Sequence, residues 1–126
     1  MNCPYCHKEA EWTENKVIYG KNYGRSFMVY LCKPCNAYVG CHNNTKKPLG
    51  TMANADTREW RKTAHAKFDP LWRDGNYSRD EAYNILNKHF GREIHIAESD
   101  SDTCKEIIEF VHNFNLSEAK AEEIQP

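Results

Sequence analysis

Two short motifs, Cys3-Pro4-Tyr5-Cys6 and Cys32-Lys33-Pro34-Cys35, decide the fold of this chain. Two residues between paired cysteines allow a tight turn that directs both sulfurs at one ion, and four thiolates complete the tetrahedral shell that zinc prefers. The 25 residues between the motifs are enough for a β-hairpin that brings them together. The spacing predicts a zinc ribbon with one structural Zn²⁺ held by Cys3, Cys6, Cys32 and Cys35.

Two other interpretations of these cysteines are that they are small core residues, or that each pair is a separate redox dithiol. Neither explains why both pairs flank one predicted hairpin. With sulfur in all four positions no coordination site is left for water, so we expect a structural ion rather than a catalytic one.

The rest of the composition describes a small folded protein. Its 126 residues, 40% hydrophobic and 12% aromatic, suit one domain over 1–126 with a modest core. No long apolar run predicts a membrane span, and no basic flank leads into an apolar stretch at the N-terminus. We therefore expect a soluble, cytoplasmic protein whose cysteines stay reduced.

The fold class is expected to be α+β, an N-terminal zinc ribbon packed on a helical half with about three helices. β-branched and aromatic residues predict strands over 16–19 and 26–31, inside a ribbon covering 1–42. The polar segment 43–53, with its proline and glycine, is typical of a loop.

The helical half is expected to cover 54–114. Asn54 or Asp56 can cap a first helix that ends at Phe68, and Asp100 or Ser101 can cap a third. Between them lies a second helix, opened by the capping box Ser78-Arg79-Asp80-Glu81 and closed by Gly91, and then a short strand over 94–96. The acidic tail, 115–126, is expected to be mobile, with room for a turn or two of helix.

Other residues of the types that bind metal are scattered over separate predicted elements. A second zinc ion, bound by some of them, is the alternative to ordinary core or surface positions. These residues are Cys41, His42, His65, His95 and Cys104.

A metal-dependent nuclease is the least favoured of three hypotheses for the function of the chain. His65 and Asp69 are spaced four residues apart, and with His95 they could hold a metal ion and a water for phosphodiester hydrolysis. Asp69 precedes Pro70, however, which is typical of a residue that ends a helix, and the sequence holds no complete catalytic motif. We expect no enzyme and no catalytic residues.

Charge is unevenly distributed along the chain. Residues 1–73 hold 12 Lys and Arg against 6 Asp and Glu, whereas residues 74–126 hold 5 against 12. The first half of the chain is therefore basic. Direct nucleic-acid binding is one functional hypothesis, because aromatic and basic side chains on the hairpin could stack on bases and contact phosphates. The hairpin residues in question are Lys16, Tyr19, Lys21, Tyr23, Arg25, Phe27 and Tyr30, extended by Lys46, Lys47, Arg58, Arg61 and Lys62.

The cysteine motifs, with the segments GCHNNTKKPLGTMA, RKTAHAKFDPLW and EAYNILNKHFG, resemble a family of small zinc-finger-containing proteins of phages, prophages and bacteria. The resemblance covers Cys3 to about Val111. It implies the zinc-ribbon fold more than an activity.

Within that neighbourhood the chain is similar in size and composition to anti-CRISPR proteins, which bind a host RNA-guided DNA nuclease and block it. The resemblance implies a protein partner in the host cytoplasm, no catalysis, and contact with the basic channel of such a nuclease. The acidic residues that would meet that channel are Glu98, Asp100, Asp102, Glu106 and Glu109. This is the leading functional hypothesis from the sequence.

Overall fold

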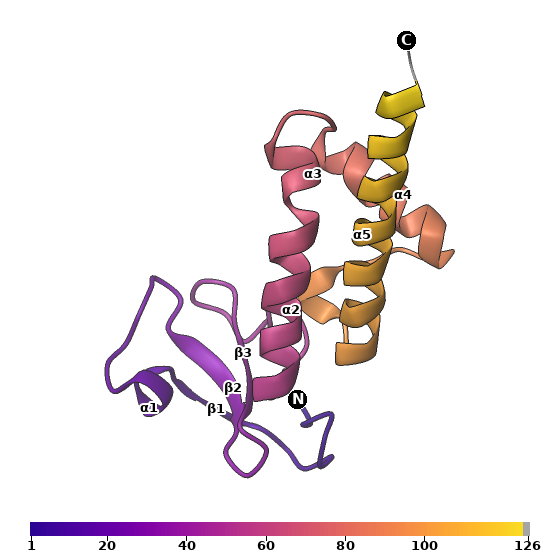
Figure 1. Ribbon diagram of the computed structural model, residues 1–126. Coiled ribbons are helices and arrows are strands. Elements are labelled where there is room, and N and C mark those ends of the chain that lie inside the picture. Colours follow the sequence, from indigo (N-terminus) through magenta and orange to yellow (C-terminus); the bar gives the residue numbers. More distant parts are fainter. Residues whose placement is uncertain (125–126) are drawn as a thin grey trace. The chain divides into compact units, whose positions relative to one another are not determined.

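The computed structural model describes residues 1–124, with side chains described for 1–119. The chain forms two compact units, which we call unit 1 (Met1–Arg58) and unit 2 (from Glu59 onward). All the strands lie in unit 1 and the long helices run through unit 2 (Figure 1). The predicted α+β class is confirmed. Folding of the whole chain as one domain stays a prediction.

Unit 1 is built on a three-stranded antiparallel sheet. Its strands are β1 (Glu11–Glu14), β2 (Met28–Cys32) and β3 (Ala37–Gly40), in the order β1-β2-β3. The predicted strand over 26–31 is therefore present as β2. The strand β3 was not predicted, and neither were the two β-bridges, Tyr38–Ala53 and Cys41–Pro48, that tie the 43–53 segment to it.

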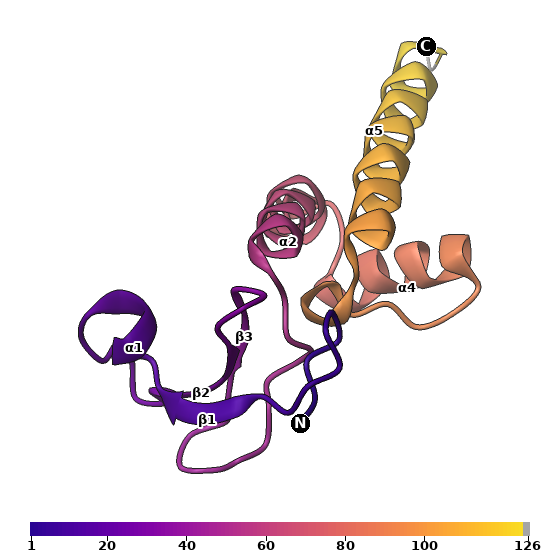
Figure 2. The same cartoon turned by 90° about the horizontal axis from the view of Figure 1, so that it is seen from below.

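The predicted strand over 16–19 is wrong, because these residues form the short helix α1 (Lys16–Tyr19), which follows the end of β1 (Figure 2). Gly20 ends the helix with φ 85°, and its amide donates to the Lys16 carbonyl. Glycine adopts this left-handed conformation at little cost. Val17 is exposed and Ile18 is only partly buried, and neither pairs with a strand of the sheet that would hold it extended.

Unit 2 continues the helix α2 (Ala55–Phe68), whose first residues belong to unit 1. It then contains α3 (Pro70–Arg73), α4 (Arg79–Phe90), the 3₁₀ turn η1 (Ile96–Glu98) and α5 (Ser101–Ile124). Its core includes Phe68, Leu86, Ile94, Ile107 and Val111, all buried.

The helix starts follow the sequence closely. Asn54 Oδ1 accepts from the Thr57 amide at 2.9 Å, and Asp100 Oδ1 accepts from the Thr103 amide at 2.8 Å, so these two residues cap α2 and α5. The capping box of Ser78 with Glu81 is complete, and Gly91 ends α4 in the left-handed region. Local sequence was enough to predict these ends.

The predicted strand over 94–96 is wrong. Ile94 and Ile96 are buried on either side of an exposed His95, as in a strand, but the Ile94 amide donates to Asn87 Oδ1 at 2.8 Å instead of to a neighbouring strand. Helix α5 continues to Ile124, through most of the predicted acidic tail, whose mobility stays a prediction. Its later residues include Ala, Lys and Glu, which favour helices. Of the predicted mobile tail, residues 125–126 lie outside the described residues.

None of the helices in residues 1–124 combines the length and the apolar character needed to cross a bilayer.

Candidate metal centre and aromatic surface

Two turns present the predicted zinc ligands. In the first, the Cys3 carbonyl accepts from the His7 amide at 2.8 Å. In the second, the Lys33 carbonyl accepts from the Asn36 amide at 3.1 Å, between β2 and β3. Both turns end in a residue with positive φ, 65° at His7 and 50° at Asn36. The chain thus reverses directly after each cysteine pair.

The four sulfur atoms of Cys3, Cys6, Cys32 and Cys35 lie within 4.8 Å of one another, and those of Cys6 and Cys32 are 3.6 Å apart. Zinc–sulfur bonds of about 2.3 Å place the sulfurs of a tetrahedral site about 3.8 Å apart. The sulfur–sulfur distances in the cluster are of this size, and all four donor groups are thiols. It therefore fits a zinc ion, which would link the N-terminal turn to the β2–β3 turn.

The electrostatics of the cluster also suit a cation. Burial raises the pKa of the Cys3 thiol, but hydrogen bonds from the backbone amides of Cys6 and Tyr5 and from neighbouring thiols lower it more, to about 7. Burial, together with the neighbouring sulfurs, raises the pKa of Cys35 to about 12. The neighbouring sulfurs thus oppose the ionisation of Cys35. A bound metal ion would remove this opposition, because its positive charge stabilises each thiolate.

Among the described side chains, the remaining residues of metal-binding types form no second group of three or more. Among the side chains of residues 1–119, the cysteine cluster is the one group of three or more such residues that converges. Cys41 is buried in unit 1 and Cys104 in the core of unit 2, and burial raises the pKa of both thiols. His65 and His95 both line one cavity of unit 2.

A second feature of unit 1 is a surface that we call the aromatic–cation cluster: Tyr19, Lys21, Tyr23, Tyr38 and Arg58. The ring of Tyr19 meets those of Tyr23 and Tyr38 edge-on, with centroids 5.6 and 6.3 Å apart. Tyr19 and Tyr23 are 49% and 50% exposed. A cation lies over each of the other two rings, Tyr23 and Tyr38.

The cations lie over the outer rings of the cluster. Lys21 Nζ is 5.1 Å from the centroid of Tyr23, and the Arg58 guanidinium is 4.0 Å from that of Tyr38. Arg58 is also fixed by donating from Nη1 to the carbonyls of Asn36 and Ala53, both at 2.7 Å. The Tyr19 hydroxyl donates to that of Tyr38, and this bond raises the pKa of Tyr19. The cluster is therefore built from several elements and held in place.

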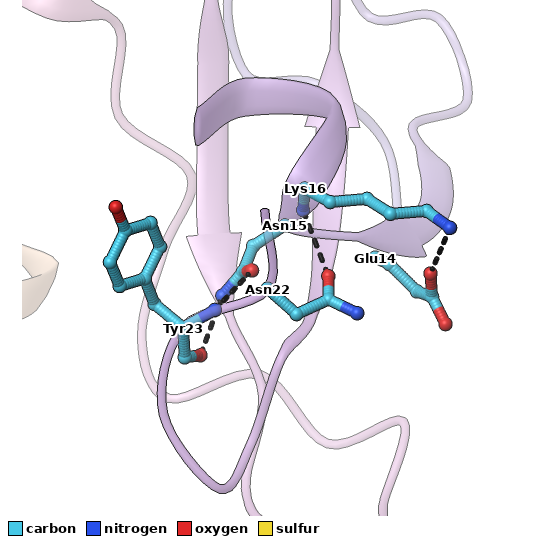
Figure 3. Close-up of polar contacts among 5 residues, drawn as sticks. All are labelled: Glu14, Asn15, Lys16, Asn22 and Tyr23. Carbon is cyan, nitrogen blue, oxygen red and sulfur yellow. Dashed lines mark hydrogen bonds and ion pairs between the residues drawn. The ribbon is translucent and has the colours of Figure 1, made fainter. Parts of the chain in front are cut away.

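The side chain of Asn15 forms two hydrogen bonds with the backbone of Tyr23, in the loop after α1 (Figure 3). Its side chain donates from Nδ2 to the Tyr23 carbonyl and accepts at Oδ1 from the Tyr23 amide, each at 2.9 Å. Asn22 Oδ1 accepts from the Lys16 amide at 3.0 Å, and Lys16 forms an ion pair with Glu14 at 3.0 Å. Asn15 is only 6% exposed. These bonds order the segment between α1 and β2.

The structure brings together only some of the hairpin residues predicted to meet nucleic acid. Tyr19, Lys21 and Tyr23 belong to the cluster, whereas Phe27 and Tyr30 are half-buried. Tyr38 was missed, because its strand was not predicted.

A further pair is Trp12 with Lys46 at 4.9 Å; Lys46 was among the predicted residues, whereas Trp12 was missed. It lies on the other face of the sheet, since Trp12 is opposite Tyr30 while Tyr38 is opposite Leu31.

Comparison with known proteins identifies the family. No curated protein and no solved structure matches the chain. A family model described as a zinc-finger-containing domain matches residues 1–114, which include all four clustered cysteines. The match confirms the predicted zinc-finger family, and with the sulfur geometry it confirms zinc as the expected cofactor. The chain belongs to the zinc-finger-containing family.

Proposed function

We propose that this zinc-stabilised protein binds single-stranded nucleic acid through the aromatic–cation cluster of unit 1. The observation that carries the proposal is the group of three contacting tyrosine rings, two of them half exposed, with a cation over each outer ring. Exposed rings stack on bases of any sequence, with about 1–3 kcal/mol per base, and nearby cations attract phosphates.

The charge of unit 1 supports this partner. Residues 1–58 hold 8 Lys and Arg against 4 Asp and Glu, a net charge of +4, whereas residues 59–126 hold 9 against 14. A positive surface raises the rate at which an anionic strand is captured, and it makes binding sensitive to salt. The net charge of the whole chain, −1, is therefore the sum of a basic unit 1 and an acidic unit 2.

Zinc would act here as a structural cross-link. When bound by Cys3, Cys6, Cys32 and Cys35, it would fix the N-terminal turn and the turn that leads into β3. Tyr38 lies on β3, and the Asn36 carbonyl next to the second turn accepts from Arg58. The metal would thereby hold two members of the cluster in position without contacting nucleic acid.

The experiment is a fluorescence anisotropy titration of the zinc-loaded chain with a labelled oligothymidine of about twelve nucleotides. We expect saturable binding that weakens as salt is raised. Tyr23→Ala should weaken it about tenfold, and Tyr23→Phe should retain it, because stacking needs the ring and not the hydroxyl. Equal affinity of the wild type and the alanine variant would contradict the proposal.

A second candidate is inhibition of an RNA-guided DNA nuclease by a phage-encoded chain of the anti-CRISPR kind. The observation that favours it is the row of exposed acidic side chains at the start of α5 and just before it, which suits a basic protein channel. These side chains are Glu98, Asp100, Asp102, Glu106 and Glu109.

Charge reversal separates the two candidates. Replacing Glu106 and Glu109 by Lys should abolish inhibition of target cleavage by a purified RNA-guided nuclease, while leaving oligonucleotide binding unchanged. Replacing Lys21 and Arg58 by Glu should do the reverse. Absence of any effect of the wild-type chain on cleavage would exclude this nuclease as the partner.

A further inference from the structure

We infer that the cavity of unit 2 binds a phosphate monoester, held by Arg79, His65 and His95. The cavity has a volume of about 320 Å³, at the lower end of the range for small-molecule sites. Its lining comes from α2, α4 and the segment between α4 and α5. This site is separate from the aromatic–cation cluster and does not depend on the function proposed for it.

Both histidines of the cavity lie near a carboxylate. His65 Nδ1 lies 3.6 Å from Oδ2 of Asp69, which is buried, and His95 Nε2 lies 3.3 Å from Oε1 of Glu93. Each imidazole therefore has one nitrogen next to a carboxylate and a second for a ligand in the cavity. An imidazolium in this position donates from both nitrogens, so it can link the carboxylate to a phosphate oxygen.

Arg79 supplies the geometry that a phosphate requires. Its guanidinium lies 4.8 Å from the ring centroid of Tyr83, and both residues line the cavity. A planar guanidinium can donate two parallel hydrogen bonds to one phosphate group. Asn84 adds an amide donor to the lining, and Asn87, also in the lining, accepts from the Ile94 amide.

The chemistry of the lining favours a phosphorylated ligand over a metal ion. In residues 1–119 the side chains of His65, His95 and the nearby carboxylates do not converge as a metal group does. Asp80 and Glu93 also line the cavity, and they can accept from hydroxyl groups. The ligand class is therefore a sugar phosphate such as a nucleoside monophosphate, supplied as a free molecule or as the phosphorylated end of a strand.

The test follows the imidazole signals of His65 and His95 by nuclear magnetic resonance in the zinc-loaded full chain. We expect uridine 5′-monophosphate to shift both signals and uridine to leave them in place. A 5′-phosphorylated and a 5′-hydroxyl tetrauridine form the second arm. A response to the monophosphate identifies a free ligand, and a response to the phosphorylated strand alone identifies its terminal phosphate.

The variants make the test specific. Arg79→Gln should weaken binding at least tenfold, since a hydrogen bond to a charged group contributes about 1.5–3 kcal/mol. Lys88→Gln, which removes an exposed cation from the same helix outside the lining, should change affinity less than twofold. Asn84→Asp, which adds a carboxylate to the lining, should also weaken binding.

Equal shifts with uridine and its monophosphate would overturn the inference. So would unchanged affinity in Arg79→Gln, or signals that respond to divalent cations and not to phosphate. Tyr23→Ala serves as the control for the aromatic–cation cluster, because it should alter oligothymidine binding without altering these imidazole shifts. The imidazole shifts therefore test the phosphate site, and oligothymidine binding separately tests the function proposed above.

Discussion

His7 and Asn36, which follow the two cysteine pairs, both have the left-handed backbone conformation, with φ of 65° and 50°. Asparagine tolerates this region and histidine adopts it at some cost, whereas a β-branched residue there is strained. The backbone at these two positions therefore controls how well the sulfur atoms converge.

We predict that His7→Val lowers zinc affinity about tenfold, because strain of about 1–2 kcal/mol would oppose the first cysteine turn. His7→Gly should bind zinc about as well as the wild type. Competition with a chromophoric chelator measures both. The matched control is His42→Val, at an exposed position of unit 1 that lacks a positive φ. Equal affinities in all three variants would contradict the role given to this backbone.

The Asn15 side chain is expected to support oligothymidine binding, because it holds the backbone of Tyr23. Asn15→Ala removes the donor and the acceptor that hold the Tyr23 backbone, in a buried position where unsatisfied groups cost about 1–3 kcal/mol each. Oligothymidine affinity should fall about tenfold while one zinc ion per chain is retained. Asn22→Ala, which removes an exposed acceptor, should have a smaller effect. Loss of zinc in Asn15→Ala would show that Asn15 supports the ribbon rather than the cluster.

The elements that could be predicted from the sequence are those determined by residues close together in the chain. A capping box, a left-handed glycine and a cysteine pair act within a few residues, so Ser78, Gly91 and the cysteine motifs indicated their structures correctly. In contrast, the 16–19 segment and Ile94–Ile96 have strand-like composition but lack a pairing strand. Tyr38 could not be placed in the cluster, since its neighbours are distant in sequence.

The capping box makes a prediction about α4. Ser78→Ala removes the oxygen that accepts from the Glu81 amide, so the free energy of unfolding should fall by about 1 kcal/mol. Urea denaturation followed by circular dichroism measures this change. Ser117→Ala, at an exposed position inside α5, should change it by less than about 0.5 kcal/mol. Indistinguishable unfolding curves for the two variants would mean that the box does not stabilise α4.

At the scale of the whole molecule, the chain combines two units with different means of stabilisation. The buried cluster of unit 1 is small and includes Cys3 and Cys32, so much of its interior consists of predicted zinc ligands. Unit 2 has its own apolar core, formed by α2 to α5 and the segment before α5. Small bodies with little apolar core depend on a metal ion or a disulfide for stability. Zinc should therefore be essential to one unit and dispensable for the other.

We predict that removal of zinc by a chelator unfolds unit 1 and leaves unit 2 helical. The near-ultraviolet signal of the ordered tyrosines and oligothymidine binding should be lost together, whereas most of the helical signal at 222 nm should remain; added zinc should restore both losses. Cys35→Ser should behave like the chelated protein, and Cys41→Ala, which removes a buried thiol outside the cluster, should keep one zinc ion. Collapse of the helical signal on chelation would show that the two units fold as one cooperative domain.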